Sequence, residues 1–264
     1  MNSRVILSLV LCLLPLFNSL AQTDFNRFLD ETASKNRIDP LGAKRFLEVE
    51  AIQEQEDLNS LELDTLKSFE NFFGISFILS NEQGCEIGYF VTLDPNGEML
   101  DQIQHTYACE IDLDAQSFVQ SEGELIDGFI KIIQEEEVVL DPSDTSANLN
   151  NSETELLIYN RYFQIEDDGY LIELSSPKRV SLDREYAFAS QELLSIDDLK
   201  DYSKNELTLI RSEILASYGH IFEVQQLQKR YEELEWYTPI GDATSKLSDI
   251  ENRNIELIDS ILLK

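Results

Sequence analysis

The middle of the chain alternates short apolar, β-branched runs with tight-turn sequences, and this pattern constrains the fold more than any other feature. Asp-Pro-Asn-Gly at residues 94–97 separates two runs, and Asp-Asp-Gly at residues 167–169 separates another two. Asn-Gly and Asp-Gly between such runs are strong hairpin signals, because tight turns need residues that tolerate positive φ. The predicted strands are residues 73–79, 87–93, 98–104, 107–113, 129–140, 156–165 and 170–174. Since their connections are short, residues 72–180 are predicted to form an antiparallel β domain of about six strands.

Helical patterns flank this region on both sides. Residues 22–71 are predicted to be helical, because apolar residues recur there at roughly helical spacing among good helix formers. In residues 185–264, Ser203-x-x-Glu206 and Ser248-x-x-Glu251 predict capped helix starts, and Gly219 predicts a helix end. The sequence therefore predicts an α+β protein with an N-terminal helical segment, an antiparallel middle domain and an all-α C-terminal module.

The first 21 residues are typical of a secretory signal peptide. Arg4 gives a positive start, residues 5–17 are mainly apolar, and Ser19-Leu20-Ala21 places small residues where signal peptidase requires them. The apolar run is too short for a membrane-spanning helix, which needs about 20 residues. No other segment approaches that length, so we expect an exported protein without a transmembrane segment. Its location would be the periplasm, the cell surface or the extracellular space.

Export changes the interpretation of the cysteines. Cys12 lies in the predicted signal peptide, which leaves Cys85 and Cys109 in the mature chain. An even pair of cysteines in an oxidising compartment usually forms a disulfide. A free reactive pair is the alternative. A bridge across this hairpin region would stabilise the fold by about 3 kcal/mol in the chain-entropy model.

The chain is strongly acidic, and the charge is concentrated in its middle. The sequence has 51 acidic and 20 basic side chains, a formal net charge of −31. Residues 46–160 contain 26 of the acids against only Lys67 and Lys131. Nucleic acid and anionic membranes are not expected as partners, because binding them needs a basic surface. A basic protein partner explains the local concentration, and so does solubility or a saline habitat.

The C-terminal stretch, from about residue 190 to residue 262, carries an ordered set of apolar, polar, glycine and aromatic positions. These are Leu194, Asp198, Leu199, Ser203, Glu206, Leu207, Arg211, Glu213, Ile214, Ala216, Gly219, Phe222, Leu227, Tyr231, Trp236, Tyr237, Pro239, Asn254 and Ile255. Their order and spacing resemble the YARHG domain, a small presumed extracellular module. The positions that depart from its motif are Ser212, Leu215, Ser217 and Tyr218, where the family has asparagine, tyrosine, arginine and histidine. The resemblance does not extend to residues 22–185, and it implies an exported bacterial module with no established activity.

Five residues of this module are the candidate binding site: Arg211, Glu213, Tyr218, Trp236 and Tyr237. The aromatic residues would form a platform and Arg211 an anchor for an anion, since aromatic faces suit sugars and peptides. In the alternative interpretation, the aromatic residues complete a small core, and Arg211 with Glu213 ties helices together.

No pattern typical of a catalytic site occurs in the sequence. His105 and His220 belong to no metal-binding motif, and there is no Gly-x-Ser-x-Gly turn and no Gly-rich phosphate loop. Both histidines are expected to be surface or helix-end residues, although a Ser–His–Asp triad stays open because its members need not be adjacent. We predict no catalytic residues, no cofactor and no enzymatic activity.

Acidic turn residues are weak candidates for calcium ligands. They are Asp112, Asp114, Asp167 and Asp168. Carboxylate oxygens suit Ca²⁺, but no run matches the twelve-residue loop pattern, and solvated turn residues are the alternative. The sequence thus predicts no definite metal site.

These observations predict an exported bacterial envelope protein that works by binding, with a C-terminal module that recognises a cell-surface component. The alternative is an acidic inhibitor or immunity-type protein that masks a basic partner. A third hypothesis, a hydrolase that uses two carboxylates, finds no distinguishable pair among the many acids. The sequence predicts no oligomeric state.

Overall fold

The computed structural model divides the chain into two compact units. The sheet unit comprises the chain up to Tyr159 together with Phe163–Ile172, and the C-terminal unit comprises Asn160–Tyr162 and Glu173–Lys264. The structure describes residues 22–54, 61–80, 84–110, 115, 117–126, 128–140, 147–150, 152–177 and 183–264. The predicted signal peptide and the candidate ligands Asp112 and Asp114 lie outside these residues.

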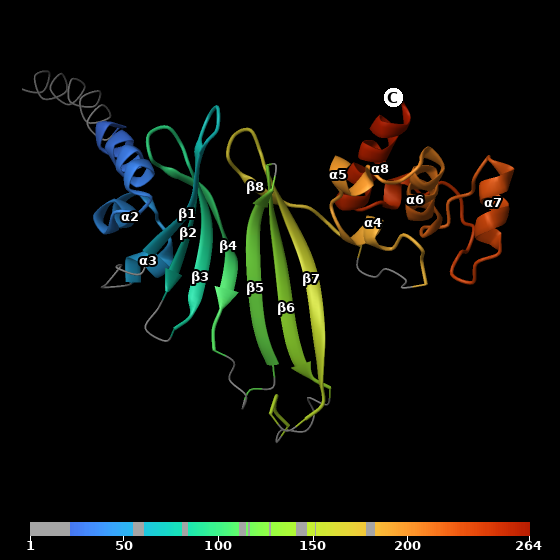
Figure 1. Ribbon diagram of the computed structural model, residues 1–264, viewed down its shortest axis with the longest axis horizontal. Helices are drawn as coiled ribbons and strands as arrows, with labels where there is room; N and C mark the ends of the chain where they lie inside the picture. Colours follow the sequence, from blue (N-terminus) through green and yellow to red (C-terminus); the bar gives the residue numbers. More distant parts are fainter. Residues whose placement is uncertain are drawn as a thin grey trace, which may run out of the picture. The chain divides into compact units, whose positions relative to one another are not determined.

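Within the described residues, eight strands form one sheet in which each strand lies beside the next one along the chain (Figure 1). The strands are β1 Leu61–Ser68, β2 Phe73–Ser80, β3 Glu86–Leu93, β4 Met99–Ala108, β5 Ser117–Ile126, β6 Phe129–Val139, β7 Thr154–Ile165 and β8 Leu171–Glu173. The pairings from β1 to β6 are antiparallel. The predicted α+β class with an antiparallel middle domain is confirmed, as short connections between successive strands require.

Strand β1 lies where the sequence pattern predicts helix, so that prediction is wrong for residues 61–68. Leu61 and Leu63 pair with Leu79 and Phe77 of β2, and the residue between them is exposed. A short apolar run of this kind fits a period of two as well as a helical period. Pairing with β2 decides in favour of the strand.

Strands β4 and β5 also differ from the prediction. β4 is continuous where the sequence suggested two runs, 98–104 and 107–113, and it ends at Ala108. A register shift against β3 lies between Gly88 and Tyr89. The sequence pattern does not predict β5, because this strand contains Gly123 and several polar residues instead of a β-branched run.

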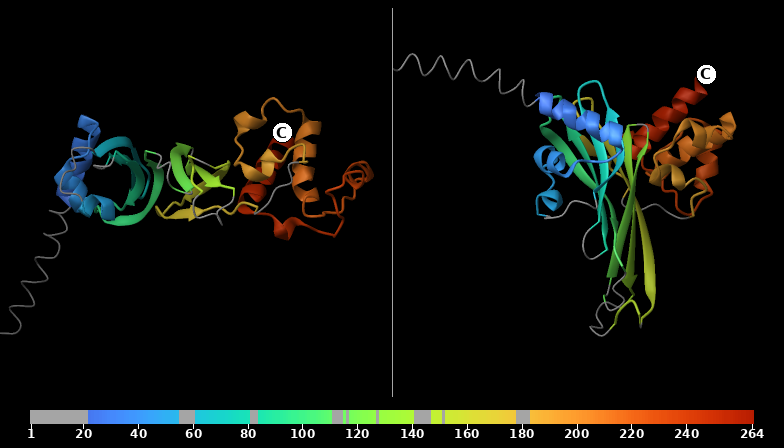
Figure 2. Two further views of the ribbon diagram at one scale, coloured as in Figure 1. Left: turned by 90° about the horizontal axis from the view of Figure 1, so that it is seen from below. Right: turned by 60° about the vertical axis from the view of Figure 1, so that its left-hand side comes forward.

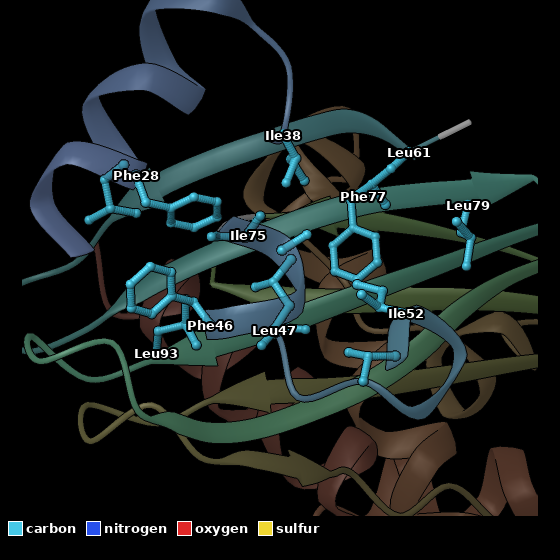
Figure 3. Packing of buried hydrophobic residues seen from close by; sticks show 14 of the residues in the cluster. Phe28, Ile38, Phe46, Leu47, Ile52, Leu61, Ile75, Phe77, Leu79 and Leu93 are labelled. Atoms are coloured by element: carbon cyan, nitrogen blue, oxygen red, sulfur yellow. The ribbon is translucent and has the colours of Figure 1, made fainter. Parts of the chain in front are cut away.

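Helices cover one face of the first strands (Figure 1). They are a helix over residues 22–35, α2 Pro40–Phe46 and α3 Glu50–Glu54. α2 begins at Asp39, whose carboxylate accepts a hydrogen bond from Gly42 N. Helices as short as α2 and α3 are not stable alone, so burial of their apolar side chains holds them in place. Figure 3 shows this contact, in which Phe46 joins the same cluster as Ile75 of β2 and Leu93 of β3.

The opposite face of the sheet packs against itself. A second hydrophobic cluster joins Phe90 of β3 to Ile130 of β6 and Phe163 of β7, although β3 is not a neighbour of β6 or β7 in the sheet. Between them, the pairing of β4 with β5 is confined to Tyr107 and Ser121 among the residues described. The sheet therefore bends here, and Figure 2 shows the two groups of strands nearly end-on.

The β3–β4 hairpin is closed at both ends. The predicted disulfide is confirmed: Cys85 directly precedes β3, Cys109 directly follows β4, and the two are bonded. At the other end, the carboxylate of Asp94 accepts a hydrogen bond from Glu98 N at 2.9 Å. Gly97 in this turn has a φ of +88°, a conformation that favours glycine.

The C-terminal unit is helical beyond the sheet. Its helices are α4 Phe188–Gln191, α5 Ile196–Leu199, α6 Lys204–Ala216, α7 Gln225–Glu232, the 3₁₀ helix η1 Thr244–Lys246 and α8 Asp249–Leu262. Ser203 and Ser248 form the predicted capping boxes at the starts of α6 and α8. Leu207 and Ile210 of α6 pack with Ile258 of α8 in one cluster. No described helix has the length and apolar character that crossing a membrane requires.

Candidate functional site

The imidazole of His105 reaches across the sheet from β4 to β2. Its Nε2 lies 3.0 Å from Ser76 Oγ on β2, and its Nδ1 lies 2.8 Å from the hydroxyl oxygen of Thr106. The backbone N–H of Gly123 on β5 donates to the same Thr106 hydroxyl at 3.3 Å. His105 and its hydroxyl partners therefore link β2, β4 and β5.

Two glycines leave the space that this ring occupies. A Cβ atom at Gly88 of β3 would lie 2.7 Å from His105 Cε1, and a Cβ atom at Gly123 would overlap the His105 side chain. Glycine inside a strand usually weakens the strand and often marks a close approach of another group. Gly88 and Gly123 are therefore the sequence signal of this site.

His105 is buried and neutral. It is only 4 % exposed, so the expectation of a surface or helix-end histidine is wrong here. Burial lowers the pKa of its imidazole, while the carboxylate of Asp64 and a hydrogen bond with the backbone of Tyr89 raise the pKa in part. Because the net direction is downward from the ordinary value of 6.5, the ring carries no charge at pH 7.

A cleft of about 510 Å³ opens beside His105, and each strand from β1 to β6 contributes to its lining. Four lining residues carry carboxylates: Asp64, Glu86, Glu122 and Glu135. Among the residues that the structure describes, the lining contains neither lysine nor arginine. Glu135 is oriented by Gln120, whose Nε2 donates to its Oε2 at 2.6 Å. The cleft is thus acidic on several sides, with a neutral histidine in its wall.

This arrangement is suited to binding a cation. Carboxylates gathered around a concave surface with apolar walls raise the local concentration of positive groups. Ser76, the hydroxyl bonded to His105, is itself buried and does not line the cleft. The Ser76–His105 contact therefore fixes the ring in the sheet and presents no nucleophile to the cleft.

In the C-terminal unit, Trp236 and Tyr237 pack around Tyr231. Their ring centroids lie 6.0 Å and 5.9 Å from the centroid of the Tyr231 ring. Tyr237 is buried, and Trp236 is half-buried. Burial raises the pKa of Tyr231 to about 12, and the Tyr231 hydroxyl lies 2.8 Å from the hydroxyl of Ser212. These aromatic residues complete a small core.

Glu213 lies in the interior, where it joins two segments of the unit. Its Oε1 accepts a hydrogen bond from Tyr186 N at 2.7 Å and lies 3.5 Å from Arg184 Nε. The Arg184 guanidinium also donates to Ser190 Oγ at 3.0 Å. Burial raises the pKa of Glu213, against the lowering effects of the Tyr186 N–H and the Arg184 charge. Arg184 precedes the stretch from about residue 190 to residue 262 on which the sequence resemblance depends, so no local sequence signal identifies it.

Tyr218 and Arg211 each contact another helix of the unit. The Tyr218 hydroxyl donates a hydrogen bond to Glu251 Oε2 at 2.8 Å. Burial is the main cause that raises the pKa of Tyr218, and the contact with Glu251 raises it further. Arg211 Nε donates to Asp259 Oδ1 at 2.6 Å across α6 and α8. All five residues predicted for binding thus make contacts within the unit, and their role in binding stays a prediction.

Asp167 and Asp168, the two calcium candidates among the described residues, lie in a turn. In the turn from β7 to β8, Asp168 Oδ1 accepts a hydrogen bond from Tyr170 N at 3.3 Å, and the carbonyl oxygen of Asp167 accepts one from the side chain of Asn71 at 3.3 Å. The described part of the chain contains no group of three or more His, Cys, Asp or Glu side chains that could hold a metal ion.

Comparison with known proteins finds a family match within the C-terminal unit. Residues 184–261 match the family model of the YARHG domain, so the predicted resemblance of this module is confirmed. No curated protein and no solved structure matches the chain. The YARHG domain together with the Cys85–Cys109 disulfide fits an exported protein.

Proposed function

We propose that the protein is an exported, non-enzymatic binding protein of the bacterial envelope, and that its acidic cleft holds a cationic group of its partner. The observation that carries this proposal is the lining of the cleft, which has four carboxylates and neither lysine nor arginine among the residues described. Of the two binding hypotheses from the sequence, this lining favours the basic partner. The YARHG module is proposed to act alongside the cleft by recognising a component of the cell surface.

The physical basis is electrostatic complementarity. Glu86 and Glu122 are exposed at the cleft, so they attract a cation before contact, and a group that enters the cleft exchanges part of its hydration for carboxylate oxygens. A volume of about 510 Å³ accommodates one or two basic side chains or a small cationic ligand. Association should therefore be fast and should weaken as salt screens the charges.

The test uses decalysine as a basic probe of the full mature chain. Wild-type protein should bind decalysine, and the triple variant Glu86→Gln, Glu122→Gln, Glu135→Gln should bind it about tenfold more weakly at physiological ionic strength. The matched control, Glu48→Gln, Glu70→Gln, Glu98→Gln, removes the same charge from exposed positions of the same unit outside the cleft.

Equal weakening in the two triple variants would show that only the net charge matters, and it would contradict a cleft-specific site. The non-enzymatic part of the proposal has its own test on purified peptidoglycan. Release of soluble fragments by the wild type that is lost in the cleft variant would replace binding by carboxylate-dependent hydrolysis.

A further inference from the structure

The outer edge of β7 lacks a backbone partner over its first half. β7 spans Thr154–Ile165, whereas β8 spans only Leu171–Glu173. The hydrogen bond from Leu174 N to Tyr162 O marks the far end of the pairing between the two strands. Among the residues described, no segment forms backbone hydrogen bonds with the outer side of residues 154–159. Figure 1 shows β7 as a long strand and β8 as a short one near the end of β7.

Exposed apolar side chains follow this edge. Leu156, Ile158 and Tyr159 are 56 %, 59 % and 44 % exposed. Because side chains alternate between the faces of a strand, Leu156 and Ile158 lie on one face and Tyr159 lies on the other. An added strand would cover apolar surface on both faces while it pairs with the free backbone groups.

The opposite edge of the sheet has the protection that this edge lacks. β1 is interrupted by a register shift between Leu63 and Thr65, and it carries three charged side chains, of which Lys67 is one. Irregular pairing and charged side chains, lysine above all, keep an edge strand from pairing with other chains. Residues 154–159 read Thr-Glu-Leu-Leu-Ile-Tyr and contain neither lysine nor proline.

The charges around this edge determine which charge its partner should carry. Residues 117–159 contain ten Asp and Glu residues against Lys131 as the one basic residue. Glu137 of the neighbouring β6 lies beside the edge, since its carboxylate accepts a hydrogen bond from the Thr154 hydroxyl at 2.7 Å. A second copy of the chain would bring two such acidic edges together, which like-charge repulsion opposes. A basic segment would be attracted.

We propose that residues 154–159 of β7 receive an extended segment of a partner protein in which basic and apolar side chains alternate. Main-chain hydrogen bonds to β7 supply the affinity, apolar side chains of the segment cover Leu156 and Ile158, and its basic side chains lie on the other face of the strand, beside Glu155. This inference goes beyond the proposed function, because none of residues 154–159 lines the acidic cleft.

The probe is a capped synthetic peptide of alternating lysine and valine, compared with the same peptide N-methylated at alternate amides. The unmodified peptide should slow amide hydrogen exchange at residues 154–159. The N-methylated peptide should lose this effect, because it cannot donate the ladder hydrogen bonds. The variant Leu156→Ser, Ile158→Ser should weaken binding by about tenfold, since it removes exposed apolar contacts without changing the charge.

The control variant Leu41→Ser, Leu263→Ser removes two exposed apolar side chains elsewhere and should bind as the wild type does. The triple cleft variant should keep the protection at residues 154–159, which separates failure of this inference from failure of the proposed function. Binding without slowed exchange at these residues, or equal binding of the N-methylated peptide, would overturn the inference. A dimer of the wild type that dissociates in the Leu156→Ser, Ile158→Ser variant would overturn it in favour of a second copy.

Discussion

The sheet unit and the C-terminal unit differ in what several of their carboxylates do. In the C-terminal unit, acidic side chains hold the fold together: Glu206 and Glu251 complete capping boxes, and Glu213 binds a backbone N–H in the interior. In the sheet unit, Glu86 and Glu122 line an exposed cleft, and no ion pair involves them among the described residues.

This difference shows that the net charge of the chain has two separate meanings. Acids that accept hydrogen bonds at helix starts or from buried donors stabilise the folded state. Acids gathered on one surface without cations repel each other, and a bound cation relieves that repulsion. Removing these acids should therefore destabilise the C-terminal unit and weaken binding by the sheet unit.

The largest effect is expected at the buried ion pair of the C-terminal unit. Glu213→Gln leaves the Arg184 guanidinium buried without its counter-charge and should lower the free energy of unfolding by about 3–5 kcal/mol. Asp259→Asn is the matched control, because its pair with Arg211 is partly exposed and should be worth about 0–1 kcal/mol. Chemical denaturation of both variants measures the difference, and equal losses would show that burial of the pair is irrelevant.

In the sheet unit, the disulfide should contribute more to the free energy of unfolding than any single acidic side chain. The variant Cys85→Ala, Cys109→Ala opens the end of the β3–β4 hairpin and should cost about 3 kcal/mol, because the bond closes a loop with a sequence separation of 24. Thermal unfolding with and without reductant checks this value. If the wild type unfolds at the same temperature after its disulfide has been shown to be reduced, that result would contradict the expected contribution.

Gly123, one of the two glycines packed against His105, offers a smaller effect on stability that is specific to this ring. Gly123→Ala places a Cβ atom against the His105 side chain and should cost about 1–3 kcal/mol. In a His105→Ala background the same substitution should cost less, because the overlapping side chain is gone. A double-mutant cycle measures this coupling, and additive losses would separate Gly123 from His105.

The smallest effect is a pH dependence from the same histidine. Because the pKa of His105 is lowered in the folded state, the unfolded chain binds the proton first, and stability falls as the pH drops below the ordinary value of 6.5. From pH 8 to pH 6 this group should account for a loss of at most about 1 kcal/mol. His105→Gln should flatten the measured pH profile by that amount, and an unchanged profile would assign the dependence to other groups.

Local patterns made part of the fold predictable. Turn residues such as Asp94 and Gly97 mark hairpins, and Ser203 and Ser248 mark helix starts, because each acts through neighbours a few residues away. The pattern predicts helix for β1 because its short apolar run fits both a helical period and a period of two, and its pairing with β2 is not visible in the local sequence.

The cleft could not be predicted in the same way. Ser76, Gly88, His105 and Gly123 lie on four different strands, and only the pairing register brings them together. No local pattern encodes that register over such separations. The concentration of charge was visible in the sequence, but its division between a lined cleft and the surrounding surface was not.

The most direct test of the two uses of charge is a nuclear magnetic resonance titration of the full mature chain with decalysine. If the cleft is the site, the largest shifts should occur at the amides of Glu86, Thr106 and Gly123, which line the cleft. The amides of Glu206, Glu213 and Glu251 should stay in place, because their carboxylates are already engaged. Shifts spread evenly over both units would contradict the account, since they would show that decalysine responds to net charge alone.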